Sequence, residues 1–165
     1  MAPASHRYFE DFAVGDVIEL GSFPPLSEED IIAFARQWDP QPIHTDPERA
    51  KDSIFGGLIA SGWHTGAIAM RLMVDGLLNE AAAQGSPGLG GLRFVRPVRA
   101  GDTLSGRYTV LEATPSTRRP AIGKVRALTE LLNQHGEVVV AMDGTGFFDR
   151  RDWRAGIHQD SNSAG

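Results

Sequence analysis

The sequence contains no cysteine, which excludes disulfide bridges, thiolate zinc sites, iron–sulfur clusters and a cysteine nucleophile. Basic residues are not in excess either: 16 lysines and arginines stand against 21 aspartates and glutamates, a formal net charge of −5. This balance argues against a nucleic-acid-binding protein. The most apolar long stretch, residues 63–83, is interrupted by Arg71, Asp75 and Glu80, which argues against a membrane span. Residues 1–12 carry charge where a secretion signal needs an apolar run, so we expect a cytoplasmic location.

The residues that are present are typical of one globular domain. A length of 165 residues and a hydrophobic content of 41% allow a single domain with a sizeable core. We place this domain at residues 8–150. The segments 1–7 and 151–165 show no hydrophobic periodicity, so we expect flexible termini there.

Hydrophobic periodicity and turn residues divide the chain into a helical first part and a β-rich second part. A strand at 16–23 precedes a helix whose N-cap is Ser27 and which must stop before two prolines. A glycine-rich loop at 54–62 leads into a long helix at about 63–82, apolar around most of its circumference. The pattern breaks at 85–88, and four strands are expected after it, at 92–98, 103–113, 122–132 and 138–148. The sequence therefore predicts an α+β fold, in which an antiparallel sheet of about five strands wraps around one long buried helix.

Two prolines separate an acid from a histidine in residues 39–44. A helix would place Asp39 and His44 about 140° apart around its axis, and a strand would place them up to ~16 Å apart. Pro40 and Pro42 exclude the helix and favour extended backbone before each of them, which predicts a stiff irregular loop. Such a loop can hold the carboxylate and the imidazole against one small molecule, for instance water. The alternative is that Asp39 caps the end of its helix and His44 only packs.

A second candidate site is the start of the long helix, at Ser61-Gly62. Unpaired N–H groups and the positive end of the helix dipole gather there, which suits an oxyanion or a polarised carbonyl. Gly62 has no side chain, so an oxygen atom can approach its backbone closely. The alternative is a plain Ser/Gly cap on a core helix.

Three nearby side chains have simpler interpretations. Asp46 directly precedes Pro47, which predicts an N-cap of a short helix. His64, in the first turn of the long helix, is expected to pack or cap more often than to bind a ligand. A metal site formed by His44, Asp46 and His64 is only weakly indicated, because the spacing H-x-D is common.

Taken together, these segments resemble the MaoC-like dehydratases, the (R)-specific enoyl-CoA hydratase group of hot-dog-fold proteins. The resemblance covers roughly residues 8–149. Its most specific part is 34–47, in which Asp39 and His44 have the same separation as the family's acid and the histidine of its Asn-Pro-x-His-x-Asp motif. Further matches lie at residues 55–62, 96–98 and 101–104.

The resemblance implies a hot-dog fold, a homodimer, and a lyase of fatty acid metabolism that reversibly hydrates a trans-2-enoyl-CoA to the (R)-3-hydroxyacyl-CoA. Asp39 and His44 would hold the water, and the Gly62 N–H would receive the thioester oxygen. Four neighbours would contact the substrate: Gln41, Ser61, Trp63 and His64. No cofactor is implied beyond the coenzyme A of the substrate, and no metal, nucleic-acid or membrane partner.

Two departures from the family pattern bear on the substrate. Gln41 stands at the family's Asn, and Met70 stands eight residues after Gly62, where the best-known hydratases have a serine. Two other functions stay open: an acyl-CoA thioesterase on the same fold, and a non-catalytic acyl-CoA-binding subunit. Release of free thiol would indicate the first, and ligand-induced stabilisation without turnover would indicate the second.

Overall fold

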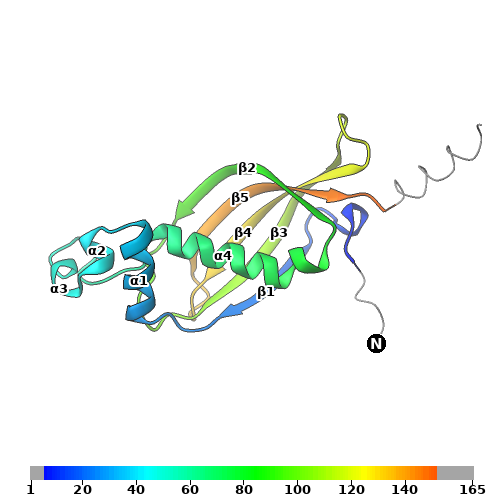
Figure 1. Cartoon of the computed structure of the whole chain (residues 1–165). Coiled ribbons are helices and arrows are strands. Elements are labelled where there is room, and N and C mark those ends of the chain that lie inside the picture. Colours follow the sequence, from blue (N-terminus) through cyan, green and yellow to red (C-terminus); the bar gives the residue numbers. More distant parts are fainter. Residues whose placement is uncertain (1–5, 152–165) are drawn as a thin grey trace, which may run out of the picture.

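The computed structural model describes residues 6–151. Its centre is one antiparallel sheet of five strands in the order β1-β3-β4-β5-β2 (Figure 1). The strands are β1 (Val17–Phe23), β2 (Ala83–Phe94), β3 (Leu104–Pro115), β4 (Ile122–Leu132) and β5 (Val138–Asp149). The predicted five-stranded α+β fold is confirmed. The predicted flexible segments lie mostly outside the described residues, but Arg7 is described and its backbone is hydrogen-bonded to Glu80 and Ala82.

A single long helix, α4 (Gly62–Gly76), runs along one face of this sheet (Figure 1). Ile68, Ala69 and Leu72 are buried, because their spacing places them on the side of the helix that faces the sheet. The opposite side is open, and Trp63 and Met70 are 63% and 45% exposed. The sheet therefore covers one side of the helix, and less of its circumference than the sequence suggested.

The central strands build the core through strict alternation. Leu104, Tyr108 and Val110 of β3 and Val125 and Leu131 of β4 are buried and belong to one hydrophobic cluster. Side chains at the intervening positions point to the outer face of the sheet.

That outer face is charged. Arg126 of β4 forms ion pairs with Glu112 of β3 and Asp143 of β5, and so links three neighbouring strands. The sheet therefore has one apolar face, and α4 packs on it.

Two predicted boundaries between the long helix and the sheet are wrong. The helix ends at Gly76, not at residue 82, and a short 3-10 helix, η2 (Leu78–Glu80), follows. At Gly76 the chain passes so close to β1 that a Cβ atom would lie 2.6 Å from the Leu20 carbonyl oxygen. Strand β2 then begins at Ala83, far before residue 92.

The predicted break at residues 85–88 lies inside β2. Gly85 and Gly88 have φ angles of 103° and 138°, which glycine adopts without steric cost. The register of β2 against β5 shifts at both residues. The glycines therefore form bulges within one long edge strand. In the sequence alone, such glycines look the same as a turn that ends a strand.

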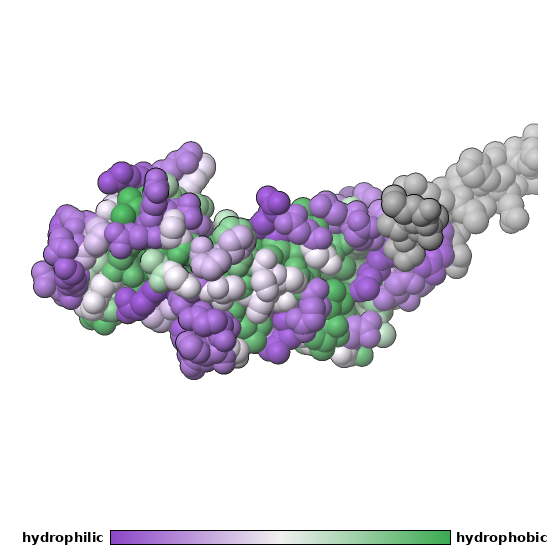
Figure 2. All heavy atoms as spheres, turned by 90° about the horizontal axis from the view of Figure 1, so that it is seen from below, coloured by the Kyte–Doolittle hydropathy of each residue, from purple (hydrophilic) through white to green (hydrophobic). Residues whose placement is uncertain are grey.

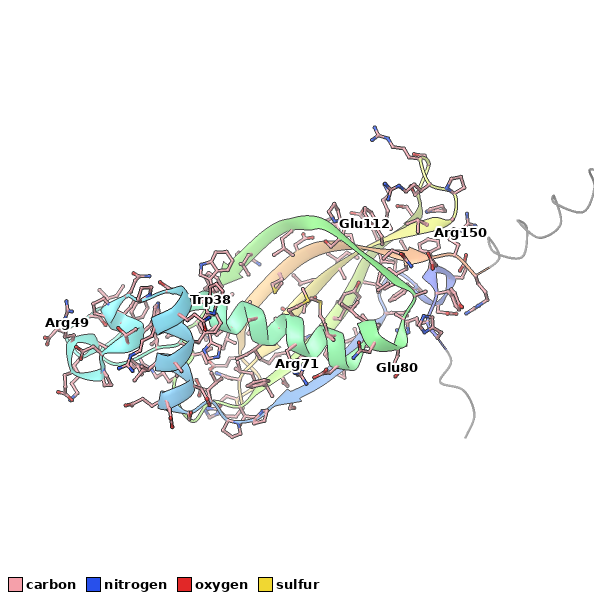
Figure 3. The ribbon with its side chains drawn as sticks, viewed as in Figure 1. Trp38, Arg49, Arg71, Glu80, Glu112 and Arg150 are labelled. Carbon is pink, nitrogen blue, oxygen red and sulfur yellow. The ribbon has the colours of Figure 1, made fainter. Side chains whose placement is uncertain are left out.

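Three short helices gather at one end of the molecule, beside the start of α4 (Figure 1). They are α1 (Glu28–Trp38), α2 (Pro42–Thr45) and α3 (Pro47–Ala50). The predicted N-cap is confirmed, because the Ser27 side chain accepts a hydrogen bond from Asp30 N. In Figure 3, Arg49 of α3 marks this end, and Arg150 marks the other. Within residues 6–151, no helix combines the length and the apolar character that a membrane span requires.

Candidate active site

The segment that follows α1 brings the acid and the histidine together. Asp39 ends α1, and the Gln41 N–H donates to the Asp39 carbonyl over 2.8 Å, which turns the chain sharply. Residues 42–45 form one helical turn instead of the predicted irregular loop, because Pro42 occupies the first helical position, where no N–H is needed. As a result, Asp39 Oδ2 lies 3.4 Å from His44 Nε2.

The protonation pattern of His44 follows from its second ring nitrogen. His44 is buried, and its Nδ1 lies 2.8 Å from the Ile59 carbonyl oxygen. A carbonyl can only accept a hydrogen bond, so Nδ1 carries the proton. In the neutral ring Nε2 then presents a lone pair toward Asp39. A water molecule at this point can donate one hydrogen bond to the carboxylate and one to the imidazole.

The Asp39 carboxylate is held in its charged form. Ser61 Oγ donates to Oδ2 over 2.6 Å, and Gln41 Nε2 donates to Oδ1 over 2.7 Å. These two hydrogen bonds hold the pKa of Asp39 below its usual value. The carboxylate is therefore ionised at neutral pH.

The start of α4 lies beside this pair. Ser61 is the N-cap of α4, and its Oγ accepts a hydrogen bond from Trp63 N. Among the described residues, the N–H of Gly62 has no protein acceptor, as expected for the first residue of a helix. A Cβ atom on Gly62 would lie 2.5 Å from the Phe94 ring. Glycine is therefore the residue that lets Phe94 lie over the start of the helix.

These groups open into one cavity of about 430 Å³. Of the seven site residues expected from the sequence, five line it: Asp39, Gln41, His44, Gly62 and Trp63. Phe94 and the segment 95–98 form another part of its wall. The structure thus places the Asp39 carboxylate, the His44 imidazole and the first residue of α4 around one space.

Ser61 and His64 do not line this cavity. Ser61 is fully buried behind Asp39. The His64 ring stacks on Phe34 of α1, with the ring centroids 4.4 Å apart and the planes 5° apart. Its Nδ1 is buried without a hydrogen-bond partner among the described residues, and burial lowers the pKa of the ring. The histidine thus belongs to the packing of α1 against α4.

Sequence reasoning missed two groups that shape the site. One is the Ile59 carbonyl, which sets the tautomer of His44 from a position 15 residues away. The other is Arg99, whose guanidinium donates to the carbonyls of Phe55 and Leu58 and so ties down the glycine-rich loop. Both are long-range contacts to backbone atoms, which leave no pattern in the sequence.

Asp46 is an N-cap, as predicted: its carboxylate accepts hydrogen bonds from Glu48 N and Arg49 N. In the part of the chain that the structure describes, no three histidine, aspartate or glutamate side chains are grouped as a metal site requires.

A second, strongly apolar cavity of about 250 Å³ lies farther along α4. Met70 and Met73 of α4 line it together with Leu89 of β2 and with Tyr108 and Met142 of the sheet. Met70, which stands at the position of the family's serine, therefore faces this cavity and not the Asp39–His44 pair.

Comparison with known proteins agrees with this arrangement. The family model described as MaoC like domain matches residues 12–131. The crystal structure of a MaoC-like dehydratase from Rhodospirillum rubrum aligns with a TM-score of 0.81 at 44% identity, over 87% of this chain and 97% of that chain. A 3-hydroxybutyryl-CoA dehydratase from Methylorubrum extorquens is 30% identical over 81% of this chain and 82% of its own length. An (R)-specific enoyl-CoA hydratase from Rhodospirillum rubrum is 30% identical over 68% of this chain and 75% of its own length.

Two findings lead to the same assignment. The family model spans most of the described residues, and the relatives align over most of their own length. This chain belongs to the family of MaoC-like dehydratases with the hot-dog fold.

Proposed function

We propose that this protein reversibly hydrates a trans-2-enoyl-CoA to the (R)-3-hydroxyacyl-CoA. One observation carries the proposal: the Asp39–His44 pair and Gly62, the first residue of α4, line the same cavity. Membership of a family whose relatives include named hydratases and dehydratases supports this reaction class.

The chemistry requires three groups, and the cavity offers them. The hydroxide part of water adds to C3 of the conjugated double bond, its proton goes to the Asp39–His44 pair, and a proton from the pair goes to C2. Negative charge develops on the thioester oxygen while C3 is attacked. The Gly62 N–H at the positive end of α4 stabilises that charge, and a donor of this kind contributes about 2.7–4 kcal/mol.

Two acceptors face the proposed position of the water, the Asp39 carboxylate and His44 Nε2. Hydrogen bonds from Ser61 and Gln41 stabilise Asp39 as a carboxylate, which lowers its tendency to take up a proton. Neutral His44 has an Nε2 lone pair free to take up a proton, and histidine is the residue type most often used as a general base. We therefore assign proton uptake to His44 and orientation of the water to Asp39.

The apolar cavity beside Met70 is a suitable place for the end of the acyl chain. Both cavities lie along α4, and Met70 is eight residues, about 12 Å, from Gly62 along the helix axis. Short acyl chains would end before this cavity, and longer ones would reach it. An apolar wall of methionines adapts to chains of different shape.

We also propose a homodimer. Strand β2 lies at one edge of the sheet, and an unpaired edge invites association. Leu89 and Phe94 on this strand are each 50% exposed, and Trp63 on the adjacent start of α4 is also exposed. On the side of the molecule seen from below in Figure 1, Figure 2 shows that further hydrophobic residues reach the surface between polar ones. Sedimentation velocity over a range of concentrations tests this, and a monomer at every concentration would refute the dimer.

A spectrophotometric assay tests the reaction itself. Loss of the enoyl-thioester absorbance without release of free thiol is expected for hydration, and chiral analysis should give the (R)-alcohol. Thiol release would instead indicate a thioesterase. Thermal stabilisation by an enoyl-CoA without turnover, over a panel of chain lengths, would indicate a binding subunit and refute the proposal.

A further inference from the structure

Ser61 links the two halves of the proposed site without touching the cavity. Its side chain is completely buried and lines neither of the two cavities described above. Its Oγ lies 2.6 Å from Asp39 Oδ2, on a residue 22 positions away, and 3.2 Å from Trp63 N in the first turn of α4. Ser61 is therefore not a substrate contact, although the resemblance implied one.

The direction of these two hydrogen bonds is fixed by chemistry. A backbone N–H can only donate and a carboxylate can only accept, so Ser61 Oγ accepts from Trp63 and gives its single proton to Asp39. The series N–H, O–H, carboxylate runs from the positive end of the α4 dipole to the acid. Hydrogen bonds in such a series polarise and strengthen one another.

We propose that Ser61 is a positioning residue that ties the Asp39 carboxylate to the start of α4, so that the acid and the Gly62 N–H keep one fixed geometry. The inference rests on the hydratase function proposed above. The oxygen that Ser61 binds is Oδ2, the same oxygen that lies 3.4 Å from His44 Nε2. Movement of this oxygen would therefore change the position of the bound water.

The electrostatic consequence concerns the charge of Asp39. The hydrogen bond from Ser61 is the largest cause of the lowered pKa of Asp39, and the bond from Gln41 comes next. The titratable group that faces this carboxylate is His44, on α2. Removal of the Ser61 hydroxyl should therefore raise the pKa of Asp39 toward its ordinary value.

Ser27 provides a matched control, because it tests whether the loss of a helix-capping serine alone would reduce activity. Ser27 makes the same pair of bonds at the start of α1: its Oγ accepts from Asp30 N over 3.0 Å and donates to Asp30 Oδ2 over 2.6 Å. Asp30 is absent from the residues that line the cavity. Ser27→Ala therefore removes a capping serine with an aspartate partner and leaves the site intact.

The test compares Ser61→Gly and Ser61→Ala with Ser27→Ala in the full-length protein. Glycine is a tolerated N-cap, so Ser61→Gly keeps the start of α4 even if the alanine variant folds poorly. We expect kcat of Ser61→Gly to fall about tenfold to a hundredfold, the range for a hydrogen bond to a charged group. KM should change by less than about twofold, because Ser61 does not contact the substrate. Ser27→Ala should leave kcat unchanged, because Ser27 and Asp30 lie outside the cavity.

Titration of the Asp39 carboxyl carbon by NMR gives a readout that does not depend on activity. We expect a higher pKa for Asp39 in Ser61→Gly than in the wild-type protein. Equal Asp39 pKa values in the two proteins, or a folded Ser61→Gly with unchanged kcat, would overturn the inference. If instead the unchanged protein hydrates no enoyl-CoA while the Asp39 pKa still rises in Ser61→Gly, the proposed function fails and the structural link stands.

Discussion

Replacement of Asp39 by asparagine should abolish most of the activity while the fold persists. The variant has nearly the same shape but carries no charge and only one acceptor oxygen. Ser61 Oγ and Gln41 Nε2 both donate to the carboxylate, so one of these donors loses its acceptor, at a cost of about 1–3 kcal/mol. Asp39 is the C-cap of α1, and its side chain is 17% exposed. The lost hydrogen bond should therefore lower the melting temperature without unfolding the protein.

The catalytic loss should be larger than the loss of stability. Removal of a group that orients the water or transfers its proton typically lowers kcat by about 10²–10⁴-fold, or ~2.7–5.4 kcal/mol at 1.36 kcal/mol per factor of ten. The assay follows enoyl-thioester absorbance with a short and a medium-chain enoyl-CoA at pH 7.

Asp46→Asn is the matched control, because Asp46 lies two residues after His44 and caps α3. Asparagine is as good an N-cap as aspartate, so this variant should keep its activity and stability. A folded Asp39→Asn with kcat within about threefold of the unchanged protein would refute the reasoning. So would an equal loss of kcat in Asp46→Asn.

Three further predictions follow from the same contacts. His44→Ala should lower kcat, and it should lower stability by about 1–3 kcal/mol because the buried Ile59 carbonyl loses its hydrogen-bond donor. The hydration assay and denaturant unfolding measure these two effects, and an equally stable variant would contradict the assigned bond. Burial lowers the pKa of His64 in the native state, so stability should be fully present above pH ~6.5 and should decline as the pH falls below it. In unfolding curves measured from about pH 5 to 8, His64→Phe should flatten this decline, and an unchanged slope would refute the assignment. Met73→Phe should narrow the apolar cavity and lower kcat/KM for long enoyl-CoAs more than for short ones; an equal change for all chain lengths would show that the acyl chain ends elsewhere.

Local rules correctly predicted the features that depend on neighbours in the chain. Ser27 and Asp46 cap their helices as expected, because each needs only an N–H group two or three residues ahead. Strands β3 and β4 follow from the alternation of buried and exposed residues, which the local sequence displays directly. The convergence of Asp39 and His44 follows from the prolines between them, although the helical turn at residues 42–45 was not expected.

The wrong boundaries arise where a distant segment decides the local conformation. Gly76 ends α4 beside the backbone of Leu20, a contact made by residues far apart in the sequence. Gly85 and Gly88 were interpreted as a turn, but pairing with β5 supplies enough hydrogen bonds to continue the strand through them as bulges.

The sequence by itself singled out the candidate catalytic residues, since the acid, the histidine and the glycine at the helix start are recognisable from type and spacing. Only the tertiary structure decided how they are held. It placed the Ile59 carbonyl on one side of His44 and the Ser61 hydroxyl on one oxygen of Asp39, and it turned His64 away from the cavity onto Phe34. The physical reason is that a hydrogen bond between residues 15 or 22 positions apart depends on the path of the whole intervening chain. No local pattern of residue types encodes that path.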